Sequence, residues 1–186
     1  MTTTTMTSRD TTTEREDLLA LLHKHRDLFR FTVQGLSDEA ARSHPTVSAL
    51  SLGGLIKHVT KVEDNWATFI VEGPGVRPEI DWETVDWSNP PAAVRDHLDS
   101  FQMREDETLA ELLAAYDVVT EATDTLLANP ALDLDHRQPL PAAPWFEPGA
   151  SWSARRVIVH IIAETAQHAG HADIIRETID GQKSMG

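Results

Sequence analysis

Apolar residues recur at helical spacing in four long segments of the chain. In residues 14–36 and again in residues 51–72 they stand three or four positions apart. Because an α-helix turns once every 3.6 residues, this spacing places them on one face. The pattern predicts two amphipathic helices, the first ending near Gly35 and the second at residues 73–75, where the sequence reads Gly-Pro-Gly.

Two more helices are expected in the second half of the chain. Thr108 begins a T-x-x-E capping box, which is typical of a helix N-terminus, and Asn129-Pro130 ends the helix that follows. The fourth helix covers about residues 153–180, just before a glycine that serves as its stop. A short helical piece within residues 91–101 precedes the third helix.

The connections between these segments decide the fold class. Residues 73–91 and 139–149 are long, proline-rich connections, and no alternating pattern of the β type competes with the helices. We therefore predict an all-α protein, a four-helix bundle with long crossover connections that forms one domain over residues 14–186. Residues 1–13 are rich in threonine and poor in large apolar side chains, which predicts a disordered tail.

Composition and charge narrow the class of function. The 186 residues, 40% of them hydrophobic, suffice for one ordinary core. No run of about 18 apolar residues and no signal-peptide pattern is present, so we expect a cytoplasmic protein without membrane association. With 30 acidic and 16 basic residues the net charge is -14, which argues against binding to nucleic acid.

Cysteine is absent from the sequence. This excludes disulfides, zinc sites built from cysteine and a cysteine nucleophile belonging to the chain. Thiol chemistry at this protein would need a second molecule that brings the sulfur.

Candidate chemistry is concentrated in the fourth predicted helix. Glu164 and His168 stand four residues apart, so their side chains leave the same face one turn from each other and could bind one ion. They share the inward stripe with His171, and burying such groups without partners would cost several kcal/mol. His58, on the inward stripe of the second predicted helix, could add a third ligand. Two imidazoles and a carboxylate suit zinc or a similar divalent ion with one position open.

Spacing alone leaves other ligand sets open. His160 lies one turn before Glu164 and His171 one turn after His168, so either could replace a member of the set. Taken alone, His58 is more simply explained as a buried histidine that hydrogen-bonds a neighbour. The remaining histidines are not expected to be ligands: His23, His25, His44, His97 and His136.

Two segments of the sequence carry a family resemblance. SLGGLIKHVTKVEDNW and HIIAETAQHAGHADIIRETIDG resemble the two signature segments of the DinB-like superfamily, and most closely its actinobacterial branch of mycothiol-dependent transferases. More distantly the chain is similar to maleylpyruvate isomerase. The resemblance implies that His58, Glu164 and His168 bind a divalent metal, usually zinc, with nickel, manganese or iron as alternatives.

The resemblance also implies a reaction. A metal-dependent transferase would use a low-molecular-weight thiol such as mycothiol to attack a small electrophile, the metal stabilising the thiolate. His171 would orient a ligand or relay a proton, and Arg155 would meet a carboxylate or sugar of the cosubstrate. Taken one at a time, Arg155 and Glu63 are more simply explained as surface residues. Glu63 could instead support the metal ligands from behind.

Two other functions are compatible with the same residues. One is a zinc-type hydrolase with metal-activated water, and the other is a non-enzymatic metal-binding bundle. The expected partners are a small-molecule thiol and an electrophile, and the expected assembly is a monomer or a homodimer.

Overall fold

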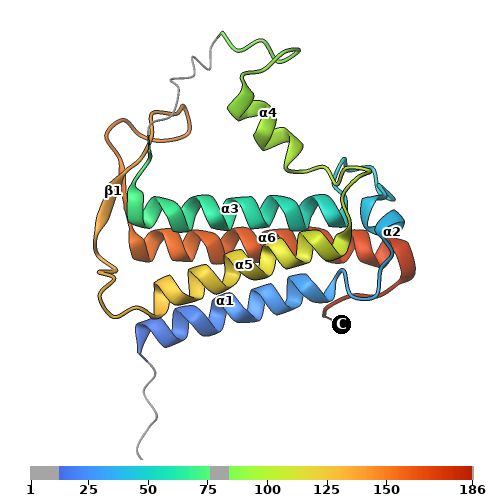
Figure 1. The fold of residues 1–186 in the computed structure, drawn as a ribbon, viewed down its shortest axis with the longest axis horizontal. Coiled ribbons are helices and arrows are strands. Elements are labelled where there is room, and N and C mark those ends of the chain that lie inside the picture. Colours follow the sequence, from blue (N-terminus) through green and yellow to red (C-terminus); the bar gives the residue numbers. More distant parts are fainter. Residues whose placement is uncertain (1–12, 76–83, 186) are drawn as a thin grey trace, which may run out of the picture.

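The computed structural model describes residues 13–75 and 84–185 (Figure 1). Residues 1–12 of the predicted tail, which covers residues 1–13, and residues 76–83 of the first crossover lie outside the described residues. Within the described ranges the secondary-structure elements are α1 (Glu14–Phe31), α2 (Asp38–Arg42), α3 (Leu52–Glu72), α4 (Ala92–Asp99), α5 (Leu109–Ala128), β1 (Arg137–Pro139), β2 (Ser151–Ser153) and α6 (Ala154–Asp180).

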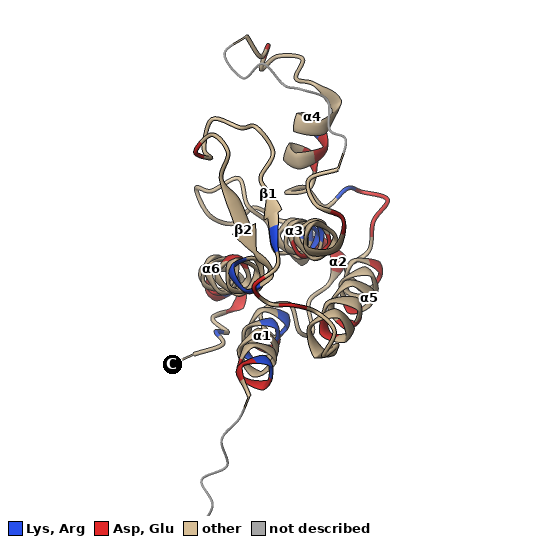
Figure 2. Ribbon diagram, turned by 90° about the vertical axis from the view of Figure 1, so that its left-hand side faces the viewer, with Lys and Arg blue, Asp and Glu red and all other residues tan. Residues whose placement is uncertain are grey.

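Four long helices form the body of the protein. Seen end-on in Figure 2, α3 and α6 lie on one side, and α1 and α5 lie on the other. Helix α3 packs against α5 and α6, and α1 packs against the same two helices. This arrangement confirms the predicted all-α bundle. None of the described helices has the length and apolar character needed to cross a bilayer.

The helix ends follow the capping signals of the sequence. The capping box at Thr108 is present, and Gly181, at a φ of 80°, ends α6 in the left-handed conformation that glycine adopts most readily. Thr13, the last residue of the predicted tail, also forms a capping box as the N-cap of α1. Helix α1 ends at Phe31, earlier than predicted, because residues 32–35 turn toward α2.

Three short elements were not predicted. Helix α2 has only five residues, and β1 and β2 form an antiparallel pair of three residues each, with Arg137 opposite Ser153. Elements this short carry no readable hydrophobic period, since a helical period is read over about 11 residues and a strand alternation over at least about four. Together with α4, the hairpin lies on the α3 and α6 side of the bundle (Figures 1 and 2).

The core is divided into two apolar clusters with a polar layer between them. One cluster includes Leu55, Tyr116 and Ile175, and the other includes Leu22, Leu127 and Ile161. Each long helix contributes residues to both clusters, and at least one buried polar residue lies between these two sets on every helix. These polar residues are Arg26 of α1, Glu63 of α3, Thr120 and Thr123 of α5, and Thr165 of α6.

An ion pair stands in the middle of this layer. Arg26 is 3% exposed and Glu63 is 0% exposed. The guanidinium donates two hydrogen bonds to the Glu63 carboxylate, one of them from Nε to Oε2 at 3.3 Å, and a third from Nη1 to Asp124 Oδ1 at 2.7 Å. The expected surface role of Glu63 is therefore wrong. Its counter-charge comes from α1, 37 residues earlier in the chain, and the local sequence pattern gives no sign of it.

Replacing Arg26 by methionine should destabilise the fold strongly. The Arg26→Met variant leaves the Glu63 carboxylate buried without its cation, so the free energy of unfolding should fall by about 3–5 kcal/mol in chemical denaturation. The double variant Arg26→Met/Glu63→Leu should recover much of this loss. Arg104→Met, at the solvent-exposed pair with Asp99, is the matched control and should change stability little. A small effect of Arg26→Met would show that the pair is dispensable.

Candidate metal centre

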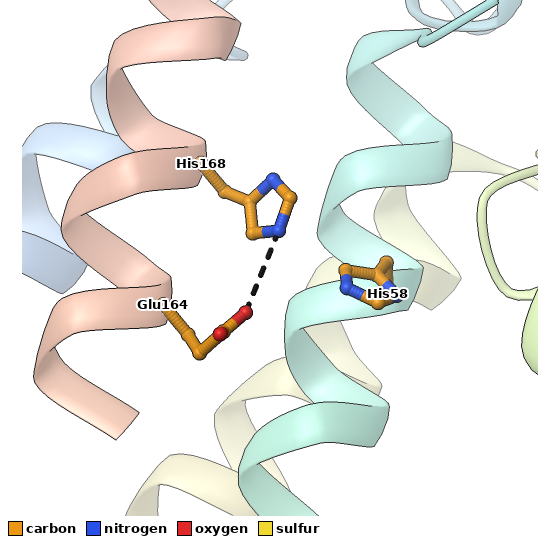
Figure 3. A group of neighbouring side chains, drawn as sticks. All are labelled: His58, Glu164 and His168. Carbon is orange, nitrogen blue, oxygen red and sulfur yellow. Dashed lines mark ion pairs between the residues drawn. The ribbon is translucent and has the colours of Figure 1, made fainter. Parts of the chain in front are cut away.

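His58, Glu164 and His168 converge between α3 and α6. One donor atom from each residue lies within 4.8 Å of the others, and the side chains point toward a common space (Figure 3). Glu164 Oε2 is 3.7 Å from His168 Nε2, too long for a hydrogen bond. The structure thus brings together the three residues singled out from the sequence.

Two helices supply the three side chains for different local reasons. Glu164 and His168 are one turn apart on α6, which aligns them along the helix axis. His58 comes from α3, which packs against α6. It is 4% exposed, whereas the side chains of Glu164 and His168 are 28% and 12% exposed. The cluster therefore has one buried wall and one side that solvent or a ligand can reach, rather than lying wholly inside the bundle.

The electrostatics of the cluster favour neutral imidazoles. Burial, reinforced by the nearby His168, His97 and Lys61, lowers the pKa of His58 from 6.5 to about 3. Burial also lowers the pKa of His168, against the opposing effect of the Glu164 carboxylate. Both rings are neutral at neutral pH and keep a nitrogen lone pair, which a metal ligand requires.

One of the three donor separations, that between Glu164 and His168, can be compared with the geometry of a bound divalent ion. Zinc held by nitrogen or oxygen ligands at 2.0–2.1 Å in a tetrahedron places those ligands about 3.3 Å apart. The Glu164 to His168 distance of 3.7 Å is within a few tenths of an ångström of that value. Two imidazoles and one carboxylate are also the ligand chemistry of zinc sites that keep an open position. The residues present therefore fit such an ion.

The other histidines of α6 flank the cluster. His160 Nε2 is 3.7 Å from Glu164 Oε1, and its ring meets Trp66 and Trp152 edge to face. His171 Nδ1 lies 3.4 Å from Nδ1 of His168. Neither belongs to the group whose donor atoms all lie within 4.8 Å of one another. His171 instead contacts the nitrogen of His168 that faces away from Glu164.

Sequence reasoning missed the contribution of α4 and the residues that follow it. The ring of Phe101 stacks on His58 with centroids 3.7 Å apart and an interplanar angle of 20°, and His97 lies 5.6 Å from His58 between centroids. The sequence does not predict His97 as a ligand. Its spacing of four residues from Phe101 was the available signal, but it is weak because nothing in the sequence places α4 beside α3.

Arg155 lies at the N-terminal start of α6, whereas Glu164 and His168 lie near the middle of that helix. Its guanidinium pairs with Glu14 and Asp135, so it joins the start of α6 to the start of α1 and to the loop before β1. Nine residues of helix, about 13 Å, separate it from Glu164. A contact between Arg155 and a cosubstrate stays a prediction.

The metal-free protein should lose stability as the pH falls from 7 to 5. The pKa of His58 is 6.5 in the unfolded chain and about 3 in the folded one, so acid in this range protonates only the unfolded state. His58 alone would then lower the free energy of unfolding by up to about 2 kcal/mol. We expect His58→Asn to remove this part of the pH dependence in urea unfolding at the two pH values.

The exposed His44 provides the control for this measurement. His44→Asn should keep the full difference between pH 7 and pH 5. If His58→Asn kept it as well, His58 would not be the buried neutral ring described above.

Known proteins include one with a similar fold and a family whose model matches this chain. A conserved protein from Enterococcus faecalis has a similar structure, with a TM-score of 0.57 over 92% of this chain and 100% of that chain. At 16% identity this likeness bears on the all-α fold alone. No curated protein matches the chain. The model of the mycothiol S-transferase family matches residues 17–181, and the chain therefore belongs to that family.

Proposed function

We propose that this protein is a metal-dependent S-transferase that joins a low-molecular-weight thiol, mycothiol, to a small electrophile. The observation that carries the proposal is the cluster of His58, Glu164 and His168 in a chain of the mycothiol S-transferase family. A divalent ion held there would bind the thiol sulfur and favour its deprotonated, nucleophilic form.

The chain itself contributes a charge balance suited to an anionic sulfur. Two neutral imidazoles and one carboxylate cancel a single positive charge of a divalent ion, so the site as a whole would remain cationic. The partial exposure of Glu164 and His168 leaves a side through which the thiol can enter. Because the chain has no cysteine, the sulfur that forms the new bond must come from the cosubstrate.

The transfer itself requires few groups from the protein. The sulfur forms a bond to the electrophilic carbon as that carbon releases its leaving group, and the thiol proton passes to water on the exposed side. His171, in contact with Nδ1 of His168, is proposed to orient that ring. We propose zinc as the ion because the donor set suits it best, with nickel, manganese or iron able to use the same ligands.

Both the metal content and the rate of thiol consumption should depend on His58 and His168. After reconstitution, elemental analysis should find one divalent ion per chain, and His58→Ala and His168→Ala should lose it. Consumption of mycothiol with a bimane electrophile should fall on the order of 100-fold or more in both variants, because an ion supplies several kcal/mol to such a reaction. His44→Ala, at an exposed histidine, should behave as the parent protein does.

Other outcomes would overturn the proposal. Metal-dependent turnover of a substrate without any thiol would show a hydrolase. Equal thiol consumption by metal-free and metal-loaded protein, across several electrophiles, would leave a metal-binding bundle without transferase activity.

A further inference from the structure

The ring of His58 is held from outside the bundle by the residues that end α4. Ser100 Oγ lies 3.1 Å from His58 Nδ1, and the Phe101 ring stacks on one face of the imidazole at 3.7 Å between centroids. Ser100 is 2% exposed and His58 is 4% exposed, so water has little access to this contact. One nitrogen of His58 is therefore occupied by α4, and the other, Nε2, is the one left for an ion.

The hydroxyl of Ser100 determines the direction of the hydrogen bond to His58. Ser100 Oγ donates its only hydrogen to the backbone carbonyl of His97, at 2.6 Å. Toward His58 the same oxygen can only accept. The hydrogen between Ser100 and His58 must therefore be carried by Nδ1 of the ring, which leaves the lone pair on Nε2.

Helix α3 is built to keep this segment close. A Cβ atom at Gly54 would lie 2.0 Å from the backbone oxygen of Phe101, so only glycine allows the chain to cross α3 at that point. Lys57 and Lys61, one residue before His58 and three after it, donate to the backbone carbonyls of Gln102 and Asp96, at 3.2 Å and 2.8 Å. These contacts hold the backbone around Ser100 against α3 and so fix the position of Ser100 relative to the His58 ring.

We propose that Ser100 is a positioning residue that fixes His58 in the tautomer with hydrogen on Nδ1 and so presents Nε2 to the space shared with Glu164 and His168. The inference rests on the proposed function in one respect, since it names the nitrogen that binds the ion. The tautomer itself is a property of the metal-free chain. A ligating histidine whose second nitrogen is hydrogen-bonded in this way is held in one orientation and is the better ligand.

Nitrogen-15 NMR of histidine-labelled, metal-free protein at neutral pH tests the tautomer. The parent protein should show His58 with hydrogen on Nδ1. Ser100→Ala should lose this preference, and Ser100→Thr, which keeps a hydroxyl, should restore it. Ser51→Ala is the matched control. Ser51 is as buried as Ser100, and its Oγ caps α3 by accepting a hydrogen bond from Gly54 N. Loss of this cap should lower the melting temperature without changing the His58 spectrum.

Metal affinity, measured by competition with a chelator, gives the second readout. Ser100→Ala should bind zinc roughly 10-fold to 100-fold more weakly than the parent, and Ser100→Thr should recover most of the loss. An unchanged tautomer in Ser100→Ala would overturn the inference, and so would a changed tautomer with unchanged affinity. If the tautomer changed as expected but no form of the protein bound metal, the assignment of Ser100 would stand and the proposed metal centre would fail.

Discussion

The ion pair between Arg26 and Glu63 is the interaction on which the alignment of the helices depends. It lies in a polar layer that separates two apolar clusters, and both side chains are buried. A buried charge that loses its partner costs several kcal/mol, so arrangements that shift α1 by a turn relative to α3 are strongly disfavoured. The apolar clusters would tolerate such a shift more easily, because dispersion and burial are not directional. The polar layer thus favours one register among several that apolar packing alone would allow.

The candidate metal centre uses this alignment. His58 lies just before Glu63 on α3, and Glu164 and His168 lie on either side of Thr165, the residue that α6 contributes to the polar layer. Fixing the polar layer therefore also fixes the level at which the three donors meet. The outer boundary of the site is supplied separately by the end of α4, which crosses α3 at Gly54 and places Ser100 and Phe101 against the imidazole. The packing of the bundle sets the distances between the three donors, and the end of α4 sets the orientation of the His58 ring.

Local patterns in the sequence were sufficient for the bundle and for the three donors of the site, but not for the residues that surround His58. Helical spacing predicted the four long helices, and the interval of four residues predicted that Glu164 and His168 share a face. Membership of the mycothiol S-transferase family agrees with the resemblance carried by the two signature segments. The partner of Glu63 and the residues that hold His58 were not predicted. Arg26 and Ser100 are 37 and 42 residues away from the side chains they contact, and such pairings are fixed by tertiary packing rather than by a period.

The proposed chemistry rests on a small number of physical facts about the chain. It brings no cysteine of its own, it keeps two neutral imidazoles beside a carboxylate, and it leaves one side of that group open. The most direct test is X-ray absorption spectroscopy of the zinc-loaded protein, with and without mycothiol. We expect scattering from two imidazoles, nitrogen and oxygen neighbours at about 2.0–2.1 Å, and a sulfur neighbour at about 2.3 Å once the thiol is added. A shell of oxygen atoms alone, without imidazole scattering and unchanged by the thiol, would contradict this expectation.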